Sequence, residues 1–357
     1  MSEPTPDDSY GASAVAEHER CTLLGLAVGD AFGTTLEFAT LPERPFGPLL
    51  TGPHREIQGG GPFSLRPGLV TDDTQMASCL AESLRACRGF DLRDVVARYR
   101  SWVVQAFDVG NQTAEALARI ARGSAPEHAA REHWSAVRGR KPAGNGALMR
   151  CAPIAVLLRD PEARRAAALA DASVTHFDPR CQLASCAYVA ALAAACAAAA
   201  RPFSLEQKRA HLEAVLGAEL ERSAEALAQS EPTLRREVEA ARHLLLEDLR
   251  LARCADPELY ADEVHLQRAQ GFVRVAFRLA LWEAFHAPDF ESGLLDIVNR
   301  GGDADTNGAI AGALLGALHG SIPERWCRTV LDVVPASALE ERFHPRRLLA
   351  LLSQREA

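Results

Sequence analysis

Apolar and polar residues along the chain follow a helical pattern, and alanine, leucine, arginine and glutamate, which all favour helices, dominate the sequence. No segment shows the run of alternating β-branched residues that is typical of a strand. The pattern predicts helices over the following ranges: 16–33, 72–87, 91–106, 111–122, 145–158, 161–172, 179–200, 204–228, 231–250, 268–287, 290–299, 304–319, 323–333 and 338–352.

These elements predict an all-α protein with one domain at residues 16–357. Residues 1–15 are polar and acidic, and we expect them to form a flexible tail. Residues 201–265 are charged, amphipathic and poor in glycine, and we expect a helical excursion on the outside of the domain. Proline and glycine concentrate in two loops, 41–68 and 138–144, and long loops in compact domains are often functional.

Composition narrows the classes of function. The chain has 357 residues, 48% of them hydrophobic, which is enough for a large core. The net charge of −8 argues against general affinity for nucleic acid or for anionic membranes. No apolar run reaches the roughly 18 residues that span a bilayer. Nine cysteines without a CxxC pair indicate reduced thiols, and we expect a cytoplasmic monomer.

Two predicted helices carry glycines at intervals of four residues. The two sets are Gly25, Gly29, Gly33 and Gly308, Gly312, Gly316, Gly320. Residues four apart lie on one face of a helix, so each set leaves a smooth groove that another backbone can approach. We therefore expect the two helices to pack together, or against a common neighbour, near the core.

Two acidic clusters begin predicted helices. They are Thr71, Asp72, Asp73 and Asp303, Asp305, Thr306. Either cluster alone is compatible with ordinary helix capping, because aspartate and threonine favour helix N-termini. Together they suggest convergence, since adjacent carboxylates repel unless a cation neutralises them. Oxygen ligands without histidine or cysteine favour Mg²⁺, Mn²⁺ or Ca²⁺ over Zn²⁺.

Shorter polar segments supply further candidates. Glu37 ends the first helix in an apolar setting, and the loops before later helices contain Asp108, Gly110, Asn111, Thr113, Gly144, Asn145, Gly146 and His176. Glycine-rich loops at helix N-termini bind anions well because their backbone N–H groups point outward. Each segment alone is also compatible with a plain turn or a structural side chain.

In combination, these segments resemble the ADP-ribosylglycohydrolase family, particularly its bacterial dinitrogenase reductase-activating branch. The matching stretches are GLAVGDAFGTTLEF, TDDTQMA, FDVGNQT, GNGALMR, THFDPR and GGDADTNGAIAGALLGALHG. The resemblance implies an all-α domain whose cleft lies at helix N-termini and contains two Mg²⁺ or Mn²⁺ ions. It also implies hydrolysis of the bond between ADP-ribose and an arginine side chain of a protein substrate, with ADP-ribose as the product.

The resemblance also implies roles for individual residues. The metal ligands fall on Thr71, Asp72, Asp73, Asp303, Asp305 and Thr306. Proton transfer falls to Glu37 or to a carboxylate of the metal cluster, with Asp72 and Asp303 as candidates. Asp108 would face the substrate guanidinium. The phosphates and ribose would lie against Gly110, Asn111, Thr113, Gly144, Asn145, Gly146 and His176.

Some assignments stay open at this level. Asp108 favours arginine because a carboxylate matches the guanidinium fork. The alternatives are a serine-linked substrate, O-acetyl-ADP-ribose, ADP-ribosylated nucleic acid, or a non-catalytic relative that binds ADP-ribose. Phe177 and Tyr188 are candidates for stacking on adenine. The sequence does not divide the acid and base roles between the carboxylates.

Overall fold

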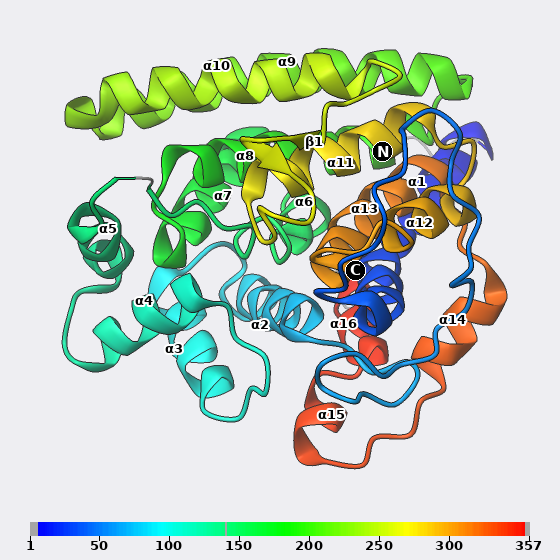
Figure 1. Cartoon of the computed structure of the whole chain (residues 1–357), viewed down its shortest axis with the longest axis horizontal. Coiled ribbons are helices and arrows are strands. Elements are labelled where there is room, and N and C mark those ends of the chain that lie inside the picture. The colour runs from blue at the N-terminus through cyan, green and yellow to red at the C-terminus, as the bar shows by residue number, and fades with distance from the viewer. Residues whose placement is uncertain (1–5, 140, 354–357) are drawn as a thin grey trace.

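A computed structural model describes residues 6–139 and 141–353. Helices dominate the described residues, and a short antiparallel hairpin has two strands of two residues each (Figure 1). The elements in chain order are α1 (Pro6–Gly33), η1 (Thr34–Leu36), α2 (Asp72–Cys87), α3 (Leu92–Val103), α4 (Asn111–Ala121), α5 (Pro126–Ala136), α6 (Ala152–Leu157), α7 (Pro161–Thr175), α8 (Pro179–Ala198), α9 (Leu205–Ser230), η2 (Pro232–Leu234), α10 (Arg235–Ala252), β1 (Tyr260–Ala261), β2 (Val264–His265), α11 (Val273–His286), α12 (Phe290–Val298), α13 (Ala304–His319), α14 (Glu324–Leu331), α15 (Ala338–Arg342) and α16 (Pro345–Ser353).

Helices α1 and α13 form an antiparallel pair in which the two glycine stripes meet. A Cβ atom added at Gly25 would lie 2.2 Å from the carbonyl oxygen of Gly312, and one added at Gly29 would lie 1.9 Å from that of Gly308. No side chain fits in such a gap, so the backbones touch only because these positions are glycine. The predicted packing of the two stripes against each other is confirmed, and we call this contact the glycine seam.

The seam sets the position of the helix ends. Gly33, the last residue of α1, lies against the start of α13, where an added Cβ would be 2.2 Å from the carbonyl oxygen of Ala304. The chain continues from Gly33 through η1 to Glu37, while Asp303 and Asp305 begin α13. Close approach of the two backbones therefore brings these three carboxylates to one end of the pair.

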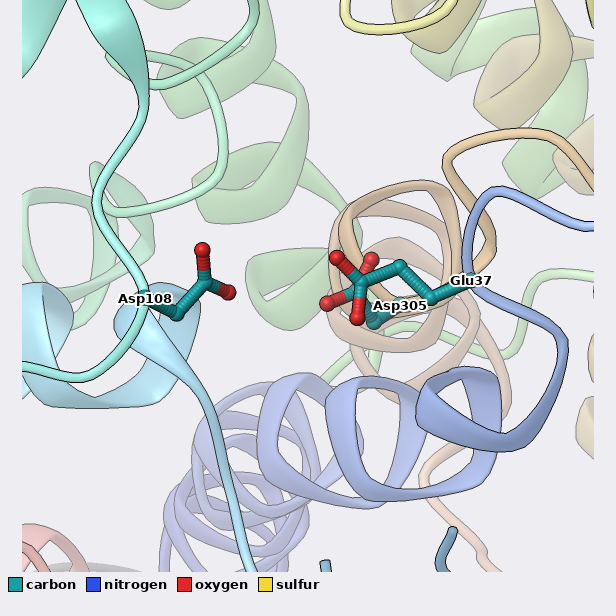
Figure 2. Close-up of side chains that lie close together, drawn as sticks. All are labelled: Glu37, Asp108 and Asp305. Atoms are coloured by element: carbon teal, nitrogen blue, oxygen red, sulfur yellow. The ribbon is translucent and has the colours of Figure 1, made fainter. Parts of the chain in front are cut away.

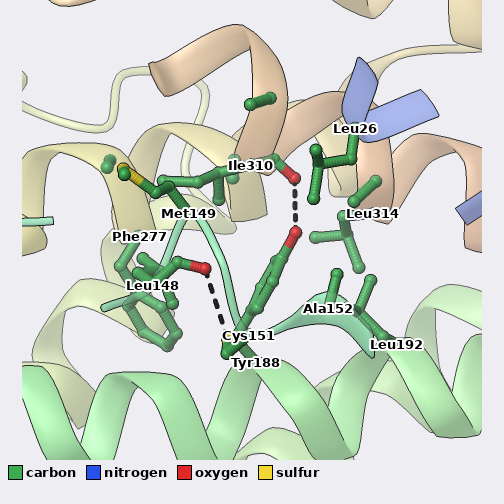
Figure 3. Close-up of a cluster of buried hydrophobic side chains, with 14 of the residues drawn as sticks. Leu26, Leu148, Met149, Cys151, Ala152, Tyr188, Leu192, Phe277, Ile310 and Leu314 are labelled. Atoms are coloured by element: carbon green, nitrogen blue, oxygen red, sulfur yellow. Dashed lines mark hydrogen bonds between the residues drawn. The ribbon is translucent and has the colours of Figure 1, made fainter. Parts of the chain in front are cut away.

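Helix α8 lies in the core and packs against α7, α9, α10 and α13. Its buried Tyr188 hydroxyl donates to the carbonyl oxygen of Ile310 at 2.7 Å (Figure 3). By length and composition α8 can cross a membrane, with a mean hydropathy of 1.7, so the expectation that no segment passes this test was wrong. Of its most apolar window, 78% is buried inside the protein, as in a core helix.

Helices α9 and α10 form a long outer layer over α8 and α11 (Figure 1). A capping box between Ser204 and Gln207 begins α9. On α10, Asp248 is fully buried and bonds Arg274 at 2.7 Å and Arg278 at 2.8 Å, both on α11. The segment 201–265 is thus helical and external, and it also covers one side of the core.

Several predicted boundaries need correction. Helix α1 begins at Pro6, so residues 6–15 of the predicted tail are helical, and residues 1–5 lie outside the described part. A Cβ added at Gly11 would lie 3.5 Å from that of Ala200, so this part of α1 packs against a neighbouring segment. The helix predicted at 145–158 is wrong for its first residues, because only α6, Ala152–Leu157, is helical. The Asn145 amide donates to the Gly271 carbonyl oxygen at 2.9 Å, which keeps the backbone before α6 in a turn.

Other differences concern helices α5, α15 and α16. The prediction missed α5, whose sequence follows a short loop without a clear apolar stripe. The predicted helix at 338–352 is two helices, because Pro345 lacks the N–H that a continuous helix needs and begins α16 instead. The strands β1 and β2 have only two residues each, too few to show an alternating pattern.

Candidate active site

Three chain segments bring carboxylates together at the end of the glycine seam. Glu37 follows η1, Asp72 and Asp73 begin α2, and Asp303 and Asp305 begin α13. All five are buried, with at most 7% of each residue exposed. The structure thus brings the two acidic clusters together, as the sequence suggested, and Thr71 Oγ1 lies 3.4 Å from Asp305 Oδ2.

A sixth carboxylate, which sequence reasoning missed, holds these segments in place. Asp30 lies on α1 and is fully buried. It accepts hydrogen bonds from the backbone N–H and hydroxyl of Thr71, each at 3.0 Å, and from those of Thr74, at 3.1 and 2.5 Å. Asp30 therefore ties α1 to the head of α2. The available signal was a charged residue one position after Gly29 in an otherwise apolar helix.

The hydroxyl of Thr71 shows that the cluster has more acceptors than donors. Thr71 Oγ1 lies 3.0 Å from Asp30 Oδ1, 3.0 Å from Asp73 Oδ2 and 3.4 Å from Asp305 Oδ2. One hydroxyl proton serves only one of these oxygens. Buried Glu37 Oε2 and Asp73 Oδ1 have no hydrogen-bond partner in the described residues. The donor set therefore fits a cation with oxygen ligands.

No basic side chain neutralises this charge among residues 6–139 and 141–353. The carboxylates concerned are Asp30, Glu37, Asp72, Asp73, Asp108, Asp303 and Asp305, and none of them forms an ion pair there. Elsewhere in the same core, Asp171, Asp248 and Asp296 each have an arginine partner. Buried charges are normally paired or bind metal, so the contrast distinguishes this cluster from the structural ion pairs.

Burial and mutual repulsion raise the pKa values of the cluster. Burial, together with the charges of Asp108 and Asp303, raises the pKa of Glu37 to about 8. Burial raises the pKa of Asp30 to about 6, although hydrogen bonds from Thr74 and Thr71 oppose the rise. Burial and neighbouring carboxylates hold the pKa of Asp73 and of Asp305 well above the usual range. Without a cation, Glu37 therefore retains a proton at neutral pH.

Asp108 joins the cluster from the opposite wall. One carboxylate oxygen each from Glu37, Asp108 and Asp305 lies within 4.8 Å of the others, as a metal ion would require (Figure 2). Burial raises the pKa of Asp108 to about 6, and a hydrogen bond with Asp72 opposes the rise. The residue that the sequence assigned to the substrate guanidinium therefore lies beside the carboxylates assigned to the metals.

The other wall of the site is neutral. Gly144 and Gly146 flank His176, and an added Cβ would lie 3.1 Å from its Nε2 at either glycine. The Gly144 amide donates to Gln112 Oε1 at 2.6 Å. Asn145 Nδ2 donates to Asp303 Oδ2 at 2.7 Å and so links this wall to the acidic one. Burial, with a smaller effect of Arg150, lowers the pKa of His176 to about 3, so this imidazole is neutral.

These walls enclose a cavity of about 400 Å³. The lining includes every residue that the sequence assigned to substrate: Asp108, Gly110, Asn111, Thr113, Gly144, Asn145, Gly146 and His176. Of the residues assigned to metal, Asp72, Asp303, Asp305 and Thr306 reach it, while Thr71 and Asp73 lie beneath its surface. Phe38, Gln112, Met149, Gln270 and Gly271 also line the cavity, and the sequence analysis gave none of them a role. The first three lie within the matching stretches, whereas Gln270 and Gly271 lie outside them.

The two aromatic candidates for adenine stacking were wrong. Tyr188 is 1% exposed and its hydroxyl bonds a backbone carbonyl in the core (Figure 3). Phe177 is 5% exposed and packs edge-on against Trp134, with ring centroids 5.7 Å apart. Neither lines the cavity. The exposed ring that does line it is Phe38, which is 53% exposed.

Comparison with known proteins agrees with this geometry. Residues 13–356 match the family described as ADP-ribosylglycohydrolase. This chain belongs to the ADP-ribosylglycohydrolase family. Its membership rests on nearly the whole sequence, and it accounts for the all-α fold that the sequence predicted.

Relatives within the ADP-ribosylglycohydrolase family include two bacterial enzymes. The ADP-ribosyl-[dinitrogen reductase] glycohydrolase of Rhodospirillum rubrum is 31% identical over 87% of this chain and 89% of its own length. The ADP-ribosylarginine hydrolase Tri1 of Serratia proteamaculans is 29% identical over 95% of this chain and 82% of its own length. A solved ADP-ribosylglycohydrolase-related protein complex superposes with a TM-score of 0.63 at 31% identity, covering 96% of this chain and 99% of the other.

Proposed function

We propose that this member of the ADP-ribosylglycohydrolase family removes ADP-ribose from arginine side chains of proteins and depends on two divalent cations. The observation that carries the proposal is a cluster of seven carboxylates without a basic partner in the described residues, most of them bordering a cavity whose remaining lining is neutral. The choice of linkage is supported by the relative named as an ADP-ribosylarginine hydrolase, and the choice of a protein substrate by the relative whose name specifies dinitrogen reductase.

The cations would be Mg²⁺ or Mn²⁺, held by Thr71, Asp72, Asp73, Asp303, Asp305 and Thr306. Six oxygen-bearing side chains without nitrogen or sulfur ligands suit these hard ions. When bound, such ions supply Lewis acidity and orient oxygen ligands. Glu37 and Asp108 border the same cluster and have a carboxylate oxygen near Asp305, so they face any substrate that reaches it.

Glu37 is our candidate for proton transfer. Hydrolysis forms a bond between water oxygen and the anomeric carbon, breaks the bond from that carbon to the guanidine nitrogen, and returns a proton to the nitrogen. Glu37 lines the cavity, and one of its oxygens has no protein partner in the described residues. In the cation-free protein, burial and the charges of neighbouring carboxylates raise the pKa of Glu37, and a carboxyl group at this position can accept or donate a proton in the reaction.

Asp108 is our candidate for recognition of arginine. Its carboxylate lies on the wall opposite Glu37 and is only half-buried (Figure 2). A guanidinium binds a carboxylate through two parallel hydrogen bonds, whereas a serine-linked substrate has no cation to offer. The glycine loops and His176 line the part of the cavity where the phosphate and ribose oxygens of ADP-ribose would lie.

The test is release of ADP-ribose from an arginine-ADP-ribosylated protein, measured with Mg²⁺, with Mn²⁺ and with EDTA, beside a serine-linked substrate. We expect release from arginine only, and only with a cation, and we expect the Asp303→Ala variant to be inactive. Release from serine alone would contradict the role of Asp108. Release that EDTA does not reduce would contradict the cation dependence.

A further inference from the structure

Behind the neutral wall of the cavity lies a buried arginine that touches no part of the proposed substrate. Arg150 is fully buried, and its Nε donates to Asp171 Oδ2 at 2.9 Å. Its Nη2 donates to the Asp171 carbonyl oxygen at 2.7 Å, and its Nη1 donates to Thr175 Oγ1 at 2.7 Å. Tyr99 packs its ring over the guanidinium at 4.8 Å and donates to the other Asp171 oxygen. The guanidinium therefore has a fixed position.

Arg150 restricts the direction of the Thr175 hydroxyl. Guanidinium has donors and no acceptor, so Thr175 Oγ1 must accept the bond from Nη1. Its other partner in the described residues is His176 Nδ1, at 2.8 Å. The hydroxyl keeps one proton and one lone pair, and among the described residues its buried proton is satisfied only if it is donated to Nδ1.

The consequence falls on His176. A neutral imidazole has one N–H, and if Nδ1 accepts, the proton is on Nε2. Nε2 is the nitrogen that lies between Gly144 and Gly146, where an added Cβ at either glycine would be 3.1 Å away. It faces the cavity that both glycines line. The chain of bonds from Arg150 thus makes Nε2–H a donor toward the ligand rather than an acceptor.

We propose that Arg150 and Thr175 are positioning residues that hold His176 as the Nε2–H tautomer, so that it donates a hydrogen bond to an oxygen of the bound ADP-ribosyl group. The identity of that ligand rests on the proposed function, whereas the tautomer does not. Arg150 also donates to the Gly146 carbonyl oxygen at 3.3 Å, so the same guanidinium steadies the glycine loop beside the imidazole.

A permanent cation suits this task better than a titratable group. Arginine stays charged at every pH at which the protein is folded, so its donors cannot become acceptors. Its charge also opposes protonation of the neighbouring imidazole, and together with burial it lowers the pKa of His176 to about 3. An imidazolium would have no acceptor nitrogen for Thr175, and the wall would lose its neutral character.

The direct test is ¹⁵N NMR of histidine-labelled protein without ligand, which distinguishes protonated from unprotonated ring nitrogens. We expect His176 to show a protonated Nε2 and an unprotonated Nδ1, with its signals assigned by their loss in the His176→Asn variant. A protonated Nδ1 in the wild-type protein would overturn the proposal. This readout needs neither ligand nor turnover, so it stands if the proposed function fails.

Variants of Thr175 test the consequence for binding. Thr175→Val keeps the shape of the side chain but removes the hydroxyl. We expect mixed tautomers of His176 and roughly tenfold weaker binding of ADP-ribose. Thr175→Ser keeps a hydroxyl and should retain both the Nε2–H tautomer and the affinity. The matched control is Thr22→Val. It removes another buried hydroxyl, which donates to the His18 carbonyl oxygen at 2.8 Å and does not line the cavity. Unchanged tautomer and affinity in Thr175→Val would contradict the relay.

Discussion

This protein contains two antiparallel helix pairs whose contacts differ: α1–α13, which forms the glycine seam, and α9–α10, which forms the outer layer. In the α1–α13 pair, glycine faces glycine and an added Cβ at Gly312 would lie 2.2 Å from the Gly25 carbonyl oxygen. Helices α9 and α10 also pack against each other, and they carry larger buried side chains, such as Leu216 on α9 and Leu245 on α10. An added Cβ at Gly217 on α9 would meet nothing within 4 Å.

The difference shows which contact positions the chemistry. The glycine seam ends at Glu37, Asp303 and Asp305, so any change in its spacing moves carboxylates that we propose bind divalent cations. The α9–α10 pair ends in ordinary caps and ion pairs, and its spacing matters for burial alone. Stability and cation affinity should therefore respond together to mutations in the seam and separately to mutations in the outer pair.

The largest effect is expected for Gly312→Leu. The new side chain overlaps the Gly25 backbone, so the helices must separate, at a cost of about 3 kcal/mol or more in the free energy of unfolding. Because Asp303 and Asp305 move with α13, cation affinity should also fall. Urea unfolding and calorimetric titration with Mn²⁺ measure the two effects, and a destabilised variant with normal Mn²⁺ affinity would break the link between seam and site.

Asp248→Asn should lower the free energy of unfolding about as much as Gly312→Leu does, without lowering the affinity for Mn²⁺. Asp248 on α10 accepts from Arg274 and Arg278, and its replacement leaves two buried guanidiniums without a counter-charge. Breaking such a buried pair costs about 3–5 kcal/mol. The same two measurements apply. Weakened Mn²⁺ binding in the folded variant would show that the outer layer also sets the geometry of the cluster.

Asp30→Asn tests the link between the seam and the head of α2. The amide cannot accept all the bonds that Thr71 and Thr74 donate to the carboxylate, so the threonines should shift. Residues that orient metal ligands typically change metal affinity by roughly 10- to 100-fold when they are mutated. Mn²⁺ titration measures this loss, and unchanged affinity would show that Asp30 is only structural.

The stability of the cation-free protein should depend on pH. The folded pKa of Glu37 is about 8 and those of Asp30 and Asp108 are about 6, all above the usual values, so the folded state binds more protons than the unfolded state. Stability in EDTA should therefore fall as pH rises from about 4 to 8. Thermal unfolding measures this trend. Excess Mg²⁺ should reduce it, and the same slope with and without Mg²⁺ would contradict cation binding by these groups.

The smallest effect is expected for Gly217→Ala. The site is open and helical, so alanine should raise the free energy of unfolding by about 1 kcal/mol through its better helix propensity. The matched Gly312→Ala variant puts the same methyl group into the seam and should destabilise. Chemical unfolding of both variants compares the two regions directly. If both substitutions changed the free energy of unfolding in the same direction, the distinction between the regions would be wrong.

Sequence patterns anticipated the seam and the two acidic helix heads because each depends on local spacing. Glycines four residues apart define a face, and Asp72, Asp73, Asp303 and Asp305 lie at positions where a helix begins. Their convergence follows from the seam, which the stripes also encode. The expectation of one all-α domain succeeded for the same reason, since helix formers and periodicity act locally.

Features that depend on tertiary packing escaped prediction. Asp30 lies inside a helix, and only the fold shows that it faces Thr71 and Thr74. Tyr188 is a candidate for stacking on adenine by sequence, but its ring is buried, and burial depends on neighbours that the sequence does not reveal. The sequence predicts helix at residues 145–150, but the hydrogen bond from the Asn145 amide to the Gly271 carbonyl oxygen keeps this segment in a turn. The placement of Asp108 beside Glu37 likewise depends on a loop without periodicity.

The central claim is that the carboxylates at the end of the seam exist to bind divalent cations. Calorimetric titration of the metal-free protein with Mn²⁺ at neutral pH tests it most directly, with Asp305→Asn as the comparison. The account predicts two ions for each wild-type chain, proton release on binding, and loss of at least one ion in the variant. A folded wild-type protein that binds no Mn²⁺ or Mg²⁺ would contradict it.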